Sequence, residues 1–158
     1  MKPTVYLETS IISYLAARPS RDLIVAAHQE ATHEWWTEQR VRFDLFVSDL
    51  VIEEISAGNA EASARRLEWI GAIERLHITL ESIGLARDII ACGALPARAQ
   101  ADAVHISLAA LNGLDYLLTW NMRHIANADV RESVRQALMD REIVAPKLCT
   151  PLEFIGDA

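Results

Sequence analysis

Short apolar runs alternate with helix-like segments along the whole chain, and this alternation limits the possible folds more than any other feature. Five runs are predicted to be strands, and they lie at residues 5–7, 45–47, 77–80, 116–119 and 147–149. Strands that alternate with helices favour the α/β class with a mainly parallel sheet. The last strand is expected at an edge of that sheet.

The segments between the strands have apolar residues at helical spacing, and polar residues that can cap helices stand at several of their starts. The predicted helices cover residues 11–17, 22–42, 49–55, 59–73, 81–92, 99–112 and 129–141. Thr9 or Ser10 is expected to cap the first helix and Asp129 the last. The helix at 99–112 is apolar on nearly every side, which predicts that it is buried against the sheet.

Length and composition predict a single domain over residues 1–158, with 51% hydrophobic and 23% charged residues. We expect no membrane span, because no apolar run approaches the roughly 18–20 residues that crossing a bilayer requires. The N-terminus has no secretory signal pattern, so a cytoplasmic location is predicted. Cys92 and Cys149 have no metal-ligand spacing and are predicted to be buried thiols. Trp35 and Trp36 are expected to pack in and around the core.

The net charge of −7 argues against broad, nonspecific affinity for nucleic acid, which needs a basic surface. It does not exclude a nuclease. A cleft rich in carboxylates binds cations, and these change the charge that a phosphate group meets.

Polar side chains recur where predicted strands end or where the helices after them begin. Glu8 follows the first strand, Glu54 lies in the helix after the second, Asp102 opens the buried helix, and Asn121 lies two residues after the fourth strand. In a parallel sheet at least three of these can converge on one edge. Clustered carboxylates repel one another, and a hard cation such as Mg²⁺ or Mn²⁺ removes that cost.

Each of these residues also has a structural explanation. Glu54 could be a solvated helix residue, and Asp102 could simply cap its helix. His105 is expected to be a core histidine or a partner of the site rather than a ligand or a base. Glu8 is the hardest to explain structurally, because a charge directly after a buried strand needs a partner. A phosphatase or receiver-like domain is disfavoured because it needs an aspartate where Glu8 stands.

Four stretches together give the chain a resemblance to a known family. They are VYLETS at 5–10, VSDLVIEEI at 47–55, DAVHI at 102–106 and YLLTWN at 116–121. In their order and their placing at strand ends, they resemble the PIN-domain ribonucleases, in particular the VapC-like toxins of bacterial and archaeal toxin–antitoxin systems.

The resemblance implies a three-layer α/β/α sandwich around a central, mainly parallel sheet, and Mg²⁺- or Mn²⁺-dependent cleavage of RNA. It places the metal-binding acids of the family on Glu8, Glu54 and Asp102, and a fourth catalytic position on Asn121. Thr119 stands close by, and Thr9, Ser10 and His105 are expected near the metal or the substrate. The family also implies a cognate antitoxin and a homodimer.

Two positions depart from the family pattern. Glu8 stands where an aspartate is usual, and Asn121 is neutral where an acid is common. The three remaining carboxylates would hold a second cation more weakly, because affinity depends on ligand charge. These departures motivate an alternative hypothesis, in which the chain is a catalytically impaired PIN-fold module that binds or regulates.

Overall fold

A five-stranded sheet forms the centre of the computed structural model, which describes residues 1–154. Its strands are β1 (Thr4–Leu7), β2 (Asp44–Ser48), β3 (Glu74–Leu76), β4 (Tyr116–Leu118) and β5 (Lys147–Cys149). The order is β3-β2-β1-β4-β5, and every neighbouring pair is parallel. The predicted parallel sheet, with its last strand at an edge, is confirmed.

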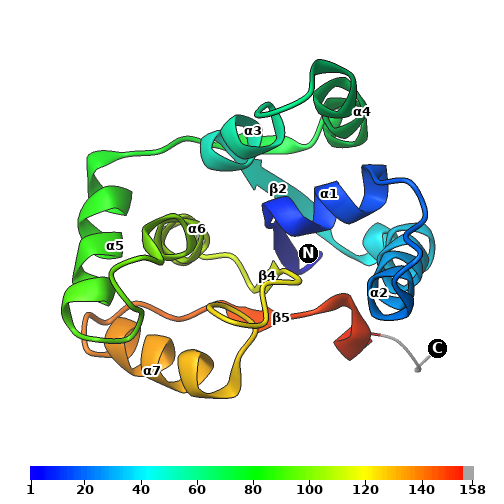
Figure 1. Ribbon diagram of the computed structural model, residues 1–158. Coiled ribbons are helices and arrows are strands. Elements are labelled where there is room, and N and C mark those ends of the chain that lie inside the picture. Colours follow the sequence, from blue (N-terminus) through cyan, green and yellow to red (C-terminus); the bar gives the residue numbers. More distant parts are fainter. Residues whose placement is uncertain (155–158) are drawn as a thin grey trace.

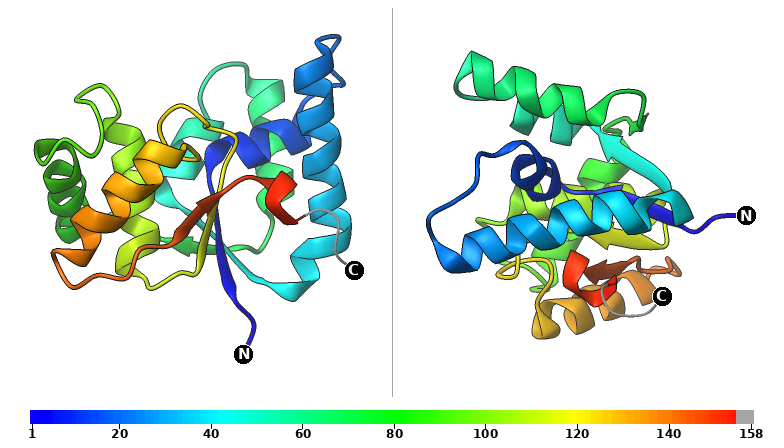
Figure 2. Two further views of the ribbon diagram at one scale, coloured as in Figure 1. Left: turned by 90° about the horizontal axis from the view of Figure 1, so that it is seen from below. Right: turned by 90° about the vertical axis from the view of Figure 1, so that its right-hand side faces the viewer.

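Helices cover both faces of this sheet (Figure 1). The helices α1 (Thr9–Ala16), α2 (Leu23–Glu34) and α4 (Ala60–Ile70) lie on one side. The other side carries α5 (Leu80–Ala91), α6 (Gln100–Leu111) and α7 (Ala128–Met139). The short helix α3 (Asp49–Ile55) follows directly on β2. Figure 2 shows the same layers from two further directions, so the predicted three-layer α/β/α fold is confirmed.

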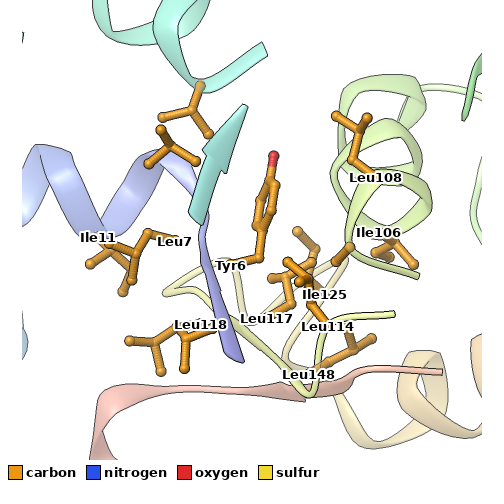
Figure 3. Packing of buried hydrophobic residues seen from close by; sticks show 14 of the residues in the cluster. Tyr6, Leu7, Ile11, Ile106, Leu108, Leu114, Leu117, Leu118, Ile125 and Leu148 are labelled. Carbon is orange, nitrogen blue, oxygen red and sulfur yellow. The ribbon is translucent and has the colours of Figure 1, made fainter. Parts of the chain in front are cut away.

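The core is built around β1 and α6. Val5, Tyr6 and Leu7 of β1 are fully buried, since neighbouring strands flank β1 on both edges and helices cover both faces of the sheet. Figure 3 shows Leu7 and Ile106 among the side chains that fill the space beside the strands. The helix α6 packs against α5 as well as the sheet, which explains why it is apolar on nearly all sides. No helix within residues 1–154 has both the length and the apolar character needed to cross a membrane.

The third strand does not lie at residues 77–80, as predicted, but a few residues earlier. Glu74 of β3 pairs with Phe46 of β2, and the chain leaves the sheet after Leu76. The Ile78 N–H donates to the Asp49 carboxylate at 2.9 Å, so it bonds to a side chain rather than to the backbone of a neighbouring strand. Thr79 then caps α5 through a reciprocal capping box, so its neighbour Leu80 begins a helix rather than ending a strand.

Three predictions about helix ends and caps are also wrong. The second α-helix ends at Glu34. A π-helical turn, Trp35–Gln39, and a 3₁₀ turn, Arg40–Arg42, follow it. The cap of α1 is Glu8 rather than Thr9 or Ser10, and the cap of α7 is Asn127 rather than Asp129.

The predicted packing roles of the tryptophans hold, whereas the prediction for the cysteines holds in part. Trp35 is fully buried against Phe43, and Trp36 is half-buried with its ring against Trp69. Cys149 is buried, and burial raises the pKa of its thiol to about 12. Cys92 is exposed, contrary to prediction, because it lies at the C-terminal end of α5, where the helix leaves the core.

The capping of α7 gives a prediction for stability. The Asn127 side-chain oxygen accepts hydrogen bonds from the N–H groups of Asp129 and Val130. We expect Asn127→Ala to lower the free energy of unfolding by about 1 kcal/mol, as loss of a helix cap usually does. Asp129→Ala is the control and should cost less in moderate salt, because its charge acts only through the screened helix dipole. Urea unfolding of both variants measures the difference, and an equal loss in both would contradict the assignment of the cap.

Candidate metal centre

The predicted site residues gather at the carboxyl ends of β1 and β4, where the order of the strands reverses. From β1 the chain goes on to β2 and β3 on one side, and it later returns to β4 and β5 on the other. The Glu8 N–H donates to the Leu118 carbonyl at 3.1 Å, so the pairing of the two strands extends to Glu8. Such a switch point is where open α/β sheets form their binding crevices.

Glu8 is buried, with 6% of its surface exposed, and its charge is compensated at one oxygen. Oε1 accepts hydrogen bonds from the Ser10 N–H at 3.1 Å, the Ser10 hydroxyl at 2.5 Å and the Thr119 hydroxyl at 2.6 Å. The longer glutamate side chain thus folds back onto the first turn of α1 and caps it. Within residues 1–154 no hydrogen bond ends on Oε2, which leaves this oxygen for a ligand.

Glu54 has the same division between its two oxygens. Oε1 accepts a hydrogen bond from the Thr9 hydroxyl at 2.7 Å and lies 2.6 Å from His105 Nε2. Partial burial opposes ionisation, but the hydrogen bond and electrostatic attraction of His105, together with the hydrogen bond from Thr9, outweigh it, so the pKa of Glu54 lies below its usual value. No partner of Oε2 is found in the part of the chain that the structure describes. Glu54 is therefore not a freely solvated helix residue, whereas its neighbour Glu53 is exposed.

The side chains of Glu8, Glu54 and His105 come close enough to share one cation. One potential ligand atom from each lies within 4.8 Å of the others. Two carboxylates this close repel each other, and each keeps an oxygen that accepts no hydrogen bond from residues 1–154. Carboxylate oxygens are the ligands that Mg²⁺ and Mn²⁺ prefer, so this donor set fits the cation that was predicted.

Asp102 lies in the first turn of α6, beside this group rather than in it. Oδ1 accepts a hydrogen bond from the Asn121 amide at 2.9 Å, and Oδ2 lies 3.1 Å from His124 Nδ1. Asp102 does not cap its helix, since Ala99 holds that position without a side-chain bond. Partial burial raises the pKa of Asp102, the neighbouring His105 and His124 offset this effect only in part, and the nearby charge of Glu8 adds to the rise.

Asn121 is placed to hold Asp102. Its amide NH₂ donates to Asp102, and its amide oxygen accepts the His124 N–H at 3.0 Å. The Asn121 N–H in turn donates to the Thr119 hydroxyl at 2.9 Å. The neutral amide therefore makes a bond to Asp102 that a carboxylate at this position could not make, because two ionised acids would repel each other.

Three residues in contact with the site were not among the predicted site residues. His124 lies in the loop after β4, beside Asp102, and nothing in the sequence distinguished it. The hydroxyls of Tyr6 and Ser48 lie 2.7 Å apart beneath Glu54 and His105. Tyr6 could have been found, because the hydroxyl of a tyrosine inside a buried strand needs a partner.

A separate hollow of about 550 Å³ lies beside β5 and α7. Arg131 is one of its charged lining residues, but its guanidinium already donates to the Leu148 carbonyl and contacts the Glu153 carboxylate. The hollow contains none of the predicted site residues. The edge at β1 and β4 is therefore the stronger candidate for function.

Comparison with known proteins identifies the fold. No protein-family model matches the chain, and no curated protein shows significant sequence similarity to it. Among solved structures, VapC20 of Mycobacterium tuberculosis, a toxin that cleaves the sarcin–ricin loop, superposes with a TM-score of 0.61 at 12% identity. This match covers 76% of the present chain and 92% of VapC20.

A second solved structure is VapBC2 of Rickettsia felis bound to a DNA fragment from its promoter. It superposes with a TM-score of 0.57 at 16% identity, covering 76% of the present chain and 89% of the other. The chain therefore has the PIN-domain fold of VapC-type toxins, as the sequence motifs predicted.

The two opposite pKa shifts predict opposite effects of removing charge in the metal-free protein. The lowered pKa of Glu54 means that its charge stabilises the fold at neutral pH, and this contribution is lost as the pH falls through the folded-state pKa. The raised pKa of Asp102 means that its charge costs stability at neutral pH, and this cost disappears in acid.

We therefore expect Glu54→Gln to lower the melting temperature at neutral pH in chelator, and Asp102→Asn to raise it. Both differences should shrink at acidic pH, where the wild-type carboxyls become protonated. Thermal unfolding of the wild type and both variants, from acidic to neutral pH, measures the expected fall and the expected rise in melting temperature. A fall in melting temperature for Asp102→Asn at neutral pH would contradict the predicted charge balance.

Proposed function

We propose that this protein is a metal-dependent endoribonuclease that hydrolyses RNA phosphodiester bonds. The observation that carries the proposal is the pair Glu8 and Glu54, each fixed through one oxygen and with no hydrogen bond from residues 1–154 at the other. Asp102 stands beside them, with its position fixed by Asn121 and His124. A bound Mg²⁺ or Mn²⁺ supplies the chemistry by activating water and stabilising charge on the phosphate group.

The residues of the chain would hold this cation and orient its ligands. Glu8, Glu54 and Asp102 are the proposed metal-binding side chains. The hydroxyls of Ser10 and Thr119 hold Glu8 in place without adding a competing positive charge, and Thr9 does the same for Glu54. The site therefore keeps a negative charge that a cation neutralises, which accords with its place in a protein of net charge −7.

The biological role that we propose is that of the toxin in a type II toxin–antitoxin pair. The PIN-domain fold shared with VapC20 and VapBC2 supports this role. A cognate antitoxin would then be the protein partner, RNA the substrate, and a homodimer the assembled form. We further propose that residues 1–158 act as a single domain in the cytoplasm.

Cleavage of a mixed RNA pool tests the activity. The purified protein should cut RNA with Mn²⁺ or Mg²⁺ and lose this activity in chelator. Asp102→Asn should reduce the rate by more than the roughly 10- to 100-fold that is typical of residues contacting only the ligands of a metal. Glu53→Gln is the matched control, because Glu53 is exposed beside Glu54 and should leave the rate unchanged.

Equal cleavage in chelator, or by the Asp102→Asn protein, would refute a metal-dependent nuclease. Absence of cleavage in the wild-type protein, together with no response to metal, would favour the alternative of a catalytically impaired PIN-fold module that binds or regulates.

Thermal unfolding with Mn²⁺ tests the metal site without relying on activity. A ligand that binds only the folded state at 100 times its Kd adds about 2.7 kcal/mol, which raises the melting temperature of a chain of this size by about 5–10 °C. Glu8→Gln should abolish this rise, because it removes a proposed ligand charge. An unchanged rise in that variant would show that the cation binds elsewhere.

A further inference from the structure

A chain of hydrogen bonds runs through the core and ends on Glu54. It starts at the Val51 N–H, which donates to the Ser48 hydroxyl at 3.2 Å. The Ser48 and Tyr6 hydroxyls lie 2.7 Å apart, and the Tyr6 hydroxyl lies 2.6 Å from His105 Nδ1. His105 Nε2 then lies 2.6 Å from Glu54 Oε1.

The middle of this chain is closed to solvent. Ser48 and Tyr6 are fully buried, and His105 is 1% exposed. Figure 3 shows the ring of Tyr6 beside α6, with its hydroxyl pointing away from Leu117. Burial raises the pKa of the phenol, so Tyr6 keeps its proton. Each hydroxyl must therefore find an acceptor among its protein neighbours, because an unpaired polar group in this position is costly.

The number of protons available shows which atom donates in each hydrogen bond of this series. The Val51 N–H can only donate, so Ser48 accepts from it, and the one remaining partner of the Ser48 proton within residues 1–154 is the oxygen of Tyr6. The proton of Tyr6 is then left for His105 Nδ1. If His105 donated from Nδ1 instead, the proton of Tyr6 would turn to Ser48, and the Ser48 proton would have no acceptor in the described residues.

We infer that His105 is a positioning residue held in its Nε2–H form, which donates to Glu54 and does not bind the cation. Its Nδ1 lone pair is taken up by Tyr6, and its Nε2 carries a proton. Although His105 lies close enough to Glu8 and Glu54 to share an ion, both of its nitrogens are occupied. The cation would therefore have only oxygen ligands from this group.

These hydrogen bonds join three elements of the fold at the site. Ser48 ends β2 and caps α3, Tyr6 lies in β1, and His105 lies in α6. Because Oε1 of Glu54 is held by His105, Oε2 is the oxygen left to face a cation. Only the part of the inference that concerns the cation rests on the proposed function, since the hydrogen-bond chain exists in the metal-free protein.

Nitrogen NMR of the metal-free protein tests this series of hydrogen bonds independently of the cation. Long-range proton–nitrogen correlations of ¹⁵N-histidine-labelled protein at neutral pH should show a proton on His105 Nε2 and none on Nδ1. The signals are assigned by their loss in His105→Gln. A neutral ring protonated on Nδ1, or a doubly protonated ring, would overturn the inference.

Binding of Mn²⁺ tests the positioning role. His105→Leu should weaken Mn²⁺ affinity by about 10- to 100-fold, as loss of a residue that orients a metal ligand usually does. His105→Gln should restore most of that affinity, because its amide can donate to Glu54 and accept from Tyr6. Electron spin echo modulation of Mn²⁺ bound to the wild-type protein should show no directly coordinated histidine nitrogen. A coordinated nitrogen that disappears in His105→Gln would overturn the inference.

Tyr6→Phe offers a gentler variant should His105→Leu fail to fold. It removes one oxygen from the chain and keeps the ring, so Mn²⁺ affinity should fall, though by less than in His105→Leu. Tyr14→Phe is the matched control, since the Tyr14 hydroxyl makes no hydrogen bond within residues 1–154. The Mn²⁺ affinity of this variant should equal that of the wild type. Equal affinity in Tyr6→Phe and the wild type would overturn the positioning role. If the wild type binds no Mn²⁺ at all, the proposed function fails as well, and the NMR result alone decides the hydrogen-bond chain.

Discussion

The pairing of β1 with two parallel neighbours is the constraint on which the site depends. Because β2 and β4 flank β1 in the same direction, the carboxyl end of β1 lies in the middle of one edge of the sheet. Glu8 leaves the strand at this point and is buried there. Its charge is compensated by hydroxyls from two sides, Ser10 of α1 and Thr119 after β4. The order of the strands thus decides which side chains can stabilise the acid.

The helix α6 connects the two halves of the site. Asp102 and His105 stand three residues apart in its first two turns, so they lie on one face of the helix. Asp102 meets Asn121 and the loop after β4, whereas His105 meets Glu54 of α3. The apolar surroundings that bury α6 between the sheet and α5 also fix these two polar side chains, because a buried helix has little freedom to shift. The packing of the core therefore also determines the geometry of the site.

The three carboxylates lie in different environments, and this difference suits a cation site. The pKa of Glu54 is lowered, mainly by its contact with His105, whereas partial burial raises the pKa of Asp102. Nearby positive charge would reverse that cost for Asp102, since an opposite charge favours the ionised form. A cation bound at such a centre would therefore improve its charge balance.

The sequence alone predicted the parallel α/β architecture, because strand periodicity is local. It also predicted that Glu8, Glu54 and Asp102 lie near one edge of the sheet, because the ends of parallel strands meet there. It missed the cap formed by Glu8, the true position of β3 and the contact of His124 with Asp102. It also gave no sign of the hydrogen bonds that join Tyr6 to Ser48 and His105, which lie 42 and 99 residues away along the chain. Only the tertiary structure decides such contacts, because the partner of a buried polar group is set by packing between elements and not by neighbouring residues in the sequence.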